Sequence, residues 1–148
     1  MYLFFDIDGV LNKESMWKTN FSLDKNLVEV FCGLCRKLNA VPIITSSWRT
    51  GFVSTNSDEN VDHIKRLEKM LLENDVRICG KTEILRGRKR DREIERYRIL
   101  HDEQAGYIII DDDPAEYETV TDRMYFTDSK TGLTEKDVRA ICKMCVKK

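Results

Sequence analysis

YLFFDIDGVLN, residues 2–12, is the stretch that decides the fold of this chain. Its first part, Tyr2–Ile7, is almost wholly apolar rather than alternating, which predicts a β-strand covered on both faces. Asp6 and Asp8 stand two residues apart where this strand ends, so both carboxylates can reach the same pocket. Gly9 then allows the backbone to turn sharply and to come close to a ligand or a metal ion.

Further apolar runs predict the other strands, and the amphipathic stretches between them predict helices. The predicted strands are Val41–Thr45, Tyr107–Ile110 and, with a weaker pattern, Arg123–Thr127. Apolar residues recur every three or four positions in the predicted helices, which are Asp24–Leu38, Val61–Glu73, Arg90–Leu100 and a last one that begins at Thr134. Alternation of strands and helices implies βαβ crossovers. We therefore expect an α/β fold, a three-layer, doubly wound, Rossmann-like sandwich with a mainly parallel sheet. The polar segment Thr50–Asn60 is expected to be a long flexible loop.

Length and composition limit the class of protein. The chain has 148 residues, 41% of them apolar and 34% charged, which suits one globular domain over residues 1–148. The formal net charge is only −1, which argues against a DNA-coating protein or a polybasic membrane binder. No apolar run approaches the roughly 18 residues of a membrane-spanning helix, and the N-terminus lacks the basic segment of a signal peptide. Five cysteines without an export signal predict reduced thiols and a cytoplasmic protein.

The residues that follow the apolar runs form the candidate site, because open parallel sheets bind ligands beyond the carboxyl ends of their strands. They are Asp6 and Asp8 after the first run, Thr45, Ser46, Ser47, Trp48 and Arg49 at the end of the second, and Asp111, Asp112 and Asp113 after the third. Carboxylates that lie close together repel one another, and a divalent cation relieves the repulsion. Mg²⁺ is the common choice where a phosphate supplies further ligands. Asp113 precedes a proline, which is typical of a turn, so we assign it a structural role.

These motifs carry a resemblance to a known superfamily. FFDIDGVLN resembles the first motif, Asp-x-Asp-Gly, of the haloacid dehalogenase-like (HAD) hydrolases. The run that ends in Thr45 resembles the second motif of that superfamily, and IIIDDD resembles the acidic pair of the fourth. More narrowly, TSSWR, the arginine-rich stretch that ends in Glu93-Ile94, YIIIDDD and TDSKTGLT are similar to the small HAD domain of Swiss Army Knife RNA repair proteins. This resemblance covers nearly the whole chain and implies a HAD-like domain with no cap or a minimal one.

The resemblance implies a phosphatase and gives roles to particular residues. Asp6 would be the nucleophile that forms an aspartyl-phosphate, and Asp8 would protonate the leaving oxygen and then activate water. Mg²⁺ would be held by Asp6, by the backbone carbonyl of Asp8, and by either Asp111 or Asp112. Thr45 would bind a phosphoryl oxygen through its hydroxyl group and nearby backbone N–H groups.

The third motif of the superfamily is a cation near the start of a helix, and three neighbouring residues qualify, namely Arg88, Lys89 and Arg90. The RNA-repair-like pattern, with an arginine four residues before the isoleucine, selects Arg90. The more general pattern permits Lys89 as the second choice. The cation would neutralise charge on the nucleophile and on the phosphoryl group.

The spacing of the motifs bears on the substrate. The segments Asn12–Ala40 and Gly51–Leu85 each hold little more than one helix, so neither has room for a sizeable cap that would select small substrates. An open site favours the end of a nucleic acid or a protein side chain. The residues expected to contact the substrate are Gly9, Thr45, Ser46, Trp48 and Arg49, and the indole ring among them could stack on a base.

The segment Lys81–Arg98 carries eight basic and four acidic side chains, a local excess of +4 that could follow a phosphate backbone. The alternative is a solvated helix laced with ion pairs, where most charge runs end up. We expect the partner to be a phosphorylated substrate, with a polynucleotide end slightly favoured and a free nucleotide as the alternative for the same chemistry. Neither a membrane nor a stable protein partner can be inferred.

A competing interpretation from another class is a non-catalytic module that binds phosphate or a partner protein through the same residues. A response-regulator receiver is rejected, because there the acidic pair comes first and the phosphorylated aspartate lies on a later strand. Two C-x-x-C pairs, Cys32/Cys35 and Cys142/Cys145, lie inside predicted helices, so buried thiols are favoured over zinc ligands. A metal site between the helices stays open if they pack together. His63 and His101 are expected to be surface residues.

Overall fold

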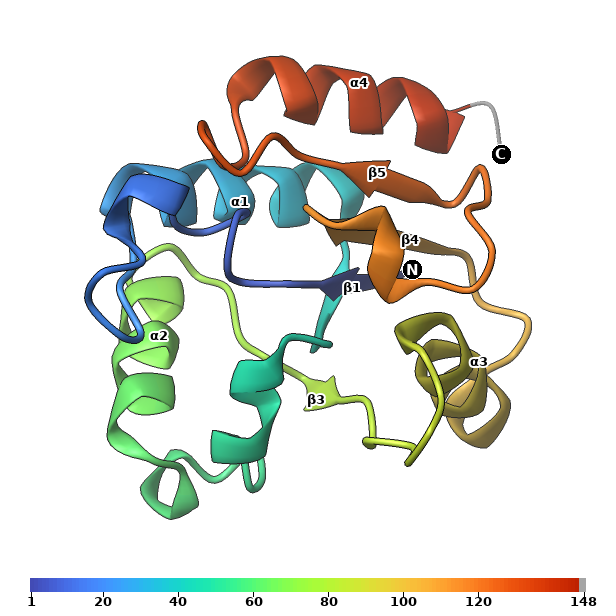
Figure 1. Cartoon of the computed structure of the whole chain (residues 1–148), viewed down its shortest axis with the longest axis horizontal. Helices are drawn as coiled ribbons and strands as arrows, with labels where there is room; N and C mark the ends of the chain where they lie inside the picture. Colours follow the sequence, from blue (N-terminus) through green and yellow to red (C-terminus); the bar gives the residue numbers. More distant parts are fainter. Residues whose placement is uncertain (147–148) are drawn as a thin grey trace.

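The apolar run at the start of the chain forms β1 (Tyr2–Phe5), the central strand of a five-stranded parallel sheet. The computed structural model describes residues 1–146 and orders the strands β3-β2-β1-β4-β5 (Figure 1). β1 pairs on one side with β2 (Val41–Ile44) and on the other with β4 (Tyr107–Asp111). The last three residues of β1 have no exposed surface, as the uninterrupted apolar run predicts for a strand covered on both faces.

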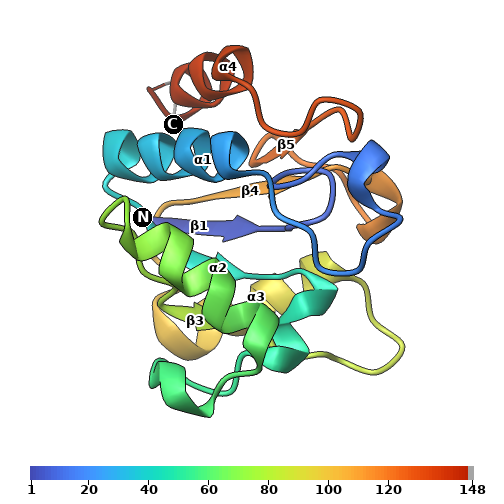
Figure 2. The same cartoon turned by 90° about the vertical axis from the view of Figure 1, so that its left-hand side faces the viewer.

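Helices cover the two faces of the sheet unevenly. In residues 1–146 the α-helices are α1 (Lys25–Leu38), α2 (Asp62–Leu72), α3 (Arg90–His101) and α4 (Glu135–Val146). The larger buried cluster joins one face of the sheet to α1, α2 and α4, while α3 is the one α-helix of the described residues on the other face (Figures 1 and 2). The structure is therefore the predicted three-layer, doubly wound sandwich. Within the described part of the chain, no helix has the length and apolar character needed to cross a membrane.

The two edge strands are short. β5 (Met124–Phe126) lies inside the weakly patterned run that predicts it, whereas β3 (Gly80–Lys81) was not predicted. A strand of two residues with a glycine and a lysine has no apolar periodicity that could reveal it. Gly80 packs closely against α3, because a Cβ atom there would come within 2.9 Å of the hydroxyl oxygen of Tyr97.

The strand order creates a crevice next to β1. The chain moves from β1 to β2 and β3 on one side, and then crosses through α3 to β4 and β5 on the other. Adjacent parallel strands whose connections leave in opposite directions form a switch point, and ligands bind there beyond their carboxyl ends. The backbone N–H of Asp6 donates to the carbonyl oxygen of Ile110 at 2.9 Å, which fixes the end of β1 against β4.

The segment expected to be a flexible loop, Thr50–Asn60, is organised around one side chain. The Asn60 side-chain oxygen accepts hydrogen bonds from the backbone N–H groups of Val53 at 2.6 Å and Ser54 at 3.2 Å. Its amide nitrogen donates to the buried carboxylate of Glu68 on α2 at 2.9 Å. A buried amide can thus order a polar segment whose composition alone predicts flexibility.

The C-x-x-C pairs lie on α1 and α4, and these two helices do pack against each other (Figure 2). All five cysteines are free, and in residues 1–146 no three metal-ligating atoms that include a cysteine sulfur converge. Cys32 and Cys35 are buried, and burial raises the pKa of the Cys32 thiol to about 11. Burial therefore favours the protonated thiol at Cys32 and Cys35.

The packing of α1 on β1 depends on Phe31, which is fully buried with its ring centroid 4.7 Å from that of Phe5. We predict that Phe31→Ala lowers the free energy of unfolding by about 3–5 kcal/mol, because it leaves a cavity under the central strand. Urea denaturation followed by circular dichroism measures the change. Val120→Ala, at a side chain that is 58% exposed, should change the stability by less than about 0.5 kcal/mol. Similar losses for both variants would contradict this account of the core.

Candidate active site

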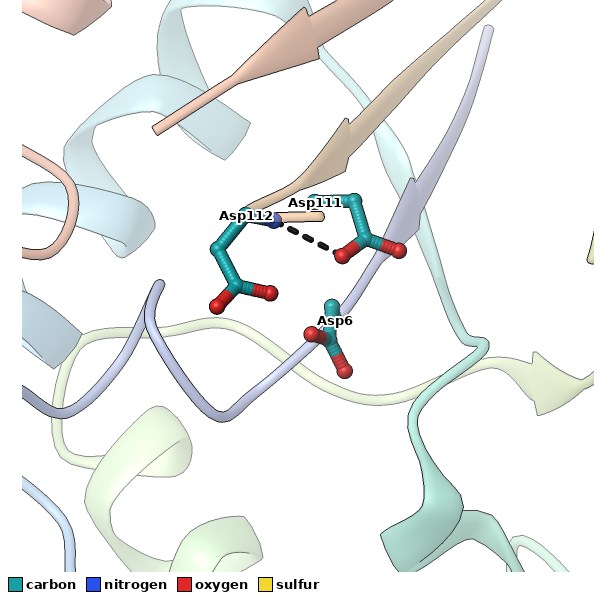
Figure 3. A group of neighbouring side chains, drawn as sticks. All are labelled: Asp6, Asp111 and Asp112. Atoms are coloured by element: carbon teal, nitrogen blue, oxygen red, sulfur yellow. Dashed lines mark hydrogen bonds between the residues drawn. The ribbon is translucent and has the colours of Figure 1, made fainter. Parts of the chain in front are cut away.

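Three aspartates converge where the chain leaves the two central strands (Figure 3). Asp6 follows β1 directly, Asp111 is the last residue of β4, and Asp112 comes next. One carboxylate oxygen of each lies within 4.8 Å of the others. The sequence predicts that these residues lie together with Asp8, although about a hundred positions separate Asp6 from Asp111. In the described residues the structure brings three of them together and leaves Asp8 out of the cluster. Their convergence follows from the parallel pairing of β1 with β4.

Arg90, the first residue of α3, bridges two of these carboxylates. Its Nη1 atom lies 2.7 Å from Asp111 Oδ2 and 3.3 Å from Asp6 Oδ1, and only 13% of its side chain is exposed. Lys89 instead donates from Nζ to the carbonyl oxygen of Ala115 at 2.7 Å. Of the predicted third-motif cations, the structure therefore brings Arg90 to the aspartates and leaves Lys89 outside them.

Asp111 is a fixed anion with both oxygens occupied. Oδ1 accepts the backbone N–H groups of Asp112 at 2.7 Å and Asp113 at 3.1 Å, while Oδ2 accepts Arg90 and the hydroxyl group of Tyr117, both at 2.7 Å. Burial alone would raise the pKa of Asp111, but Arg90 and Tyr117 outweigh it, so its pKa lies below the ordinary value. Tyr117 has no signal in the sequence, because it reaches this carboxylate only through the turn after β4.

The pKa values of Asp6 and Asp112 shift in the opposite direction to that of Asp111. Burial, followed by the negative charge of Asp111, raises the pKa of Asp6 well above its ordinary value despite the opposing charge of Arg90. Burial and the adjacent Asp111 carboxylate raise the pKa of Asp112 to about 6. Three carboxylates thus lie together while Arg90 pairs with only two of them, Asp6 and Asp111, which leaves negative charge uncompensated. An all-oxygen donor set with excess negative charge fits a hard divalent cation, and Asp6 and Asp112 are the members not already saturated by protein donors.

Gly9 makes the approach of Asp112 possible. Its φ angle is +81°, and a Cβ atom at this position would lie 2.3 Å from Asp112 Oδ2. Its backbone N–H donates to the Asn12 side-chain oxygen at 2.9 Å, and its carbonyl oxygen accepts the Thr127 hydroxyl at 2.7 Å. The sequence reasoning assigned Gly9 correctly to a sharp turn but did not identify Asn12 or Thr127, which fix that turn.

Asp8 is two residues after Asp6 in the chain, and its carboxylate is held by two side-chain donors. Asn12 donates from Nδ2 to Asp8 Oδ1 at 2.9 Å, and Trp48 donates from Nε1 to Asp8 Oδ2 at 3.3 Å. Trp48 is only 3% exposed, so the expectation that its ring stacks on a base is not supported. The tryptophan instead orients the carboxylate.

The side-chain hydroxyl of Thr45 forms no hydrogen bond with the described residues. The register of β1 with β2, continued one step past Phe5 and Ile44, places Thr45 next to Asp6. Its side chain is fully buried, and within residues 1–146 its hydroxyl oxygen has no hydrogen-bond partner. A buried hydroxyl without a partner is costly, so this atom is a candidate for contact with a ligand. Ser46 differs, because its hydroxyl accepts the backbone N–H of Trp48 at 3.1 Å and so has a structural partner.

Arg49 is an internal residue, which does not support the prediction that it binds substrate. Its Nη2 atom lies 2.8 Å from Glu93 Oε1 on α3, and the two side chains are only 7% and 4% exposed. Arg49 also donates to the carbonyl oxygen of Thr45. Glu93 accepts the backbone N–H of Leu85 at 2.8 Å through its other oxygen. This buried ion pair ties the end of β2 to the helix that carries Arg90, a pairing of distant residues that no local pattern could reveal.

In this parallel α/β sheet, aspartates lie at the ends of β1 and β4, and an arginine begins α3, the helix that leads to β4. This combination is that of a HAD-like hydrolase domain. Residues 2–138 match the family described as the HAD domain in Swiss Army Knife RNA repair proteins. Because the match spans nearly the whole chain, the chain belongs to this family, as the motifs indicated. Searches of curated proteins and of solved structures found no match.

The uncompensated charge generates a prediction about metal binding. A divalent cation such as Mg²⁺, at about one hundred times its Kd, should raise the free energy of unfolding by about 2.7 kcal/mol. Asp112→Asn should lose most of this response, yet be more stable than the unaltered chain in chelator, because it removes one of the repelling charges. Thermal unfolding with Mg²⁺ and with chelator measures both effects. Asp113→Asn, two residues from Asp111 and exposed, should respond like the unaltered chain; an equal metal response in Asp112→Asn would exclude this site.

Proposed function

We propose that the protein is a Mg²⁺-dependent phosphatase that forms an aspartyl-phosphate on Asp6. The observation that carries this proposal is the cluster of Asp6, Asp111 and Asp112, with the guanidinium group of Arg90 paired to the first two. Asp6 and Asp112, with the backbone carbonyl of Asp8, would hold Mg²⁺, whose charge would shield the anionic nucleophile from the anionic substrate. Asp111 would hold Arg90 in place, because its oxygens are already saturated by protein donors.

In the first step a carboxylate oxygen of Asp6 attacks phosphorus and the bond to the leaving oxygen breaks. Asp8 gives its proton to that oxygen, which leaves as an alcohol. In the second step Asp8 takes a proton from water, the resulting hydroxide attacks the phosphoryl group, and the bond to Asp6 breaks to release phosphate. The donors on Asp8, from Asn12 at 2.9 Å and Trp48 at 3.3 Å, support this role because they fix the position of its carboxylate.

The transferring phosphoryl group needs donors for its other oxygens. Arg90 lies 3.3 Å from Asp6, so its guanidinium group would neutralise charge on both the nucleophile and the phosphoryl group. The Thr45 hydroxyl, which lacks a partner in the described chain, would donate to a phosphoryl oxygen. The substrate would thus supply the hydrogen-bond partner that this buried hydroxyl lacks.

This mechanism predicts which carboxylates are essential. With p-nitrophenyl phosphate and Mg²⁺, Asp6→Asn should abolish phosphate release, and Asp8→Asn should lower kcat by about a thousandfold because the general acid and base is lost. The chelator should abolish turnover by the unaltered enzyme. Asp113→Asn is the matched control, because its side chain only accepts the backbone N–H of Ala115, at 2.9 Å, and an amide oxygen can do the same.

The result that would contradict the mechanism is turnover in Asp6→Asn equal to that of the unaltered enzyme. No turnover with any divalent metal, together with tight binding of phosphorylated oligonucleotides, would favour the non-catalytic phosphate-binding module instead. Asp6→Asn would then bind phosphate as well as the unaltered chain or better, because a repelling charge is gone.

We further propose that the substrate is the phosphorylated end of a polynucleotide. Most cations in the segment Lys81–Arg98 have protein partners and so cannot all follow a phosphate backbone. The partnered side chains are Lys81, Lys89, Arg90, Arg92, Arg96 and Arg98. In residues 1–146, Arg86 and Arg88 are exposed and have no side-chain partner. Arg88 also lines a cavity of about 310 Å³ together with Arg90, the residue that pairs with Asp6 and Asp111.

Removal of the Arg88 side chain therefore tests whether the protein contacts the phosphate backbone of a polynucleotide. Arg88→Ala should weaken binding of a phosphorylated oligonucleotide several-fold and reduce the slope of log affinity against log salt by about one. Turnover of p-nitrophenyl phosphate should not change. Arg96→Ala, which removes an exposed cation paired with Glu83 at 3.5 Å, is the matched control and should leave the salt slope unchanged. Identical slopes for all three proteins would argue against a backbone contact at Arg88.

A further inference from the structure

A cavity of about 320 Å³ opens beside Asp8 and is separate in its lining from the three aspartates. Two large aromatic side chains in its wall, Trp17 and Phe21, are each 42% exposed. The rest of the lining is mostly amide and hydroxyl groups, from Asn12, Thr19, Asn20, Ser22 and Ser47. Exposed rings around a hollow of mixed polarity are typical of a site for a planar ligand with polar edges.

Trp17 is held by its edge, which leaves ring surface uncovered. Its Nε1 atom donates to Asn12 Oδ1 at 2.9 Å, and the same Asn12 side chain donates to Asp8 Oδ1 at 2.9 Å. The carboxamide of Asn12, itself 1% exposed, therefore stands between the indole ring and the Asp8 carboxylate. This arrangement sets the ring back from Asp8 by the width of one amide group.

Phe21 adopts a backbone conformation that is unfavourable for an aromatic residue, with φ at +59°. Its ring stacks on His63 of α2 at 3.7 Å, with 6° between the planes, and meets Trp48 edge-on at 5.1 Å. Arg66 of α2 donates to its carbonyl oxygen. His63, expected to be a simple surface residue, thus supports one wall of the cavity. Contacts from α2 hold Phe21 at the cavity although its local backbone preference opposes this.

The position of the cavity indicates which part of a substrate would fill it. In the proposed mechanism, on which this step rests, Asp8 protonates the leaving oxygen, so the leaving alcohol must lie on the side of Asp8. The cavity begins at Asp8 and extends to Trp17 and Phe21. The leaving alcohol would therefore carry a flat group at some distance from its oxygen.

We propose that this cavity binds the base of the nucleoside that carries the scissile phosphate, with Trp17 and Phe21 against the base. A sugar would occupy the space beside Asn12, and the polar lining would meet the edge of the base. A phosphotyrosine side chain fits less well, because its ring is bonded directly to the leaving oxygen and would have to lie at Asp8 itself. Base stacking on aromatic side chains is also tolerant of base identity, which suits a nucleic-acid end.

Fluorescence tests the binding step without turnover. The chain has two tryptophans, and Trp48 is 3% exposed whereas Trp17 is 42% exposed, so a stacked base should mainly quench Trp17. In the Asp6→Asn variant with Mg²⁺, adenosine 3′- or 5′-monophosphate should quench the emission saturably, and glycerol phosphate should not. The additional change Trp17→Phe should remove the quenching, while isothermal titration calorimetry should show that most of the affinity remains.

Kinetics with the active enzyme separate stacking from general damage. Trp17→Ala and Trp17→Phe both lose the hydrogen bond to Asn12, so any effect on glycerol phosphate hydrolysis should be the same in the two variants. Relative to glycerol phosphate, Trp17→Ala alone should lower kcat/KM for the nucleotide by about tenfold, mainly through KM. Trp17→Phe keeps a ring but loses the bond to Asn12, and it should retain most of the activity on the nucleotide. Ile99→Ala, at a side chain that is 56% exposed on α3 and outside the lining of this cavity, is the control and should affect neither substrate.

The outcomes distinguish this site from the proposed function. Quenching by nucleotide without phosphate release from any substrate would leave the base site standing and overturn the phosphatase. Hydrolysis of glycerol phosphate without quenching would overturn the base site and leave the phosphatase standing. Equal losses for both substrates in Trp17→Ala, or a preference for a phosphotyrosine peptide over the nucleotide, would also overturn the base site.

Discussion

The structure depends on one guanidinium group placed between two buried carboxylates. Arg90 lies 2.7 Å from Asp111 and 3.3 Å from Asp6, and nearly all of its side chain is buried with them. Breaking a buried ion pair by removing one partner is costly, so this contact holds the start of α3 at the carboxyl ends of β1 and β4. One turn later Glu93 pairs with Arg49 after β2. Two buried ion pairs thus fix the only helix that, in the described residues, covers this face of the sheet.

A second constraint comes from Asn12, a buried amide that connects the proposed chemistry to the proposed recognition. Its oxygen accepts the N–H groups of Gly9 and Trp17, and its nitrogen donates to Asp8 and to the carbonyl oxygen of Ser22. One side chain therefore fixes the turn after β1, the orientation of the Asp8 carboxylate and the segment that carries the exposed indole ring. Because every one of its hydrogen bonds is about 2.9 Å long, the turn and the cavity wall form one connected unit.

The sequence predicts those parts of the site that depend on strand ends. Asp6 and Asp111 meet because parallel strands place their carboxyl ends at one edge, and a run of apolar residues reveals each strand. Arg90 could be chosen among three cations only through the resemblance to a family. Tyr117 and Glu93 could not be predicted, since both act through tertiary contacts with no period or spacing in the chain. For Trp48 the local pattern is misleading, because a tryptophan in a polar motif suggests an exposed ring. Its indole is instead buried, contacts His63 of α2 and donates a hydrogen bond to Asp8.

The balance of charge also limits how a substrate can be recognised. The net charge is −1, and most cations of the arginine-rich segment pair with neighbouring acids or carbonyl groups, as Arg92 does with Glu118 at 3.0 Å. Long-range attraction of a polyanion is therefore weak, because paired charges produce little field at a distance. Affinity for a phosphorylated end would have to come from short-range contacts: the phosphoryl group at Arg90 and Thr45, and a flat ring against Trp17. Such a division favours recognition of a terminus over binding along a strand, because only a terminus offers a phosphate and a free base to both positions at once.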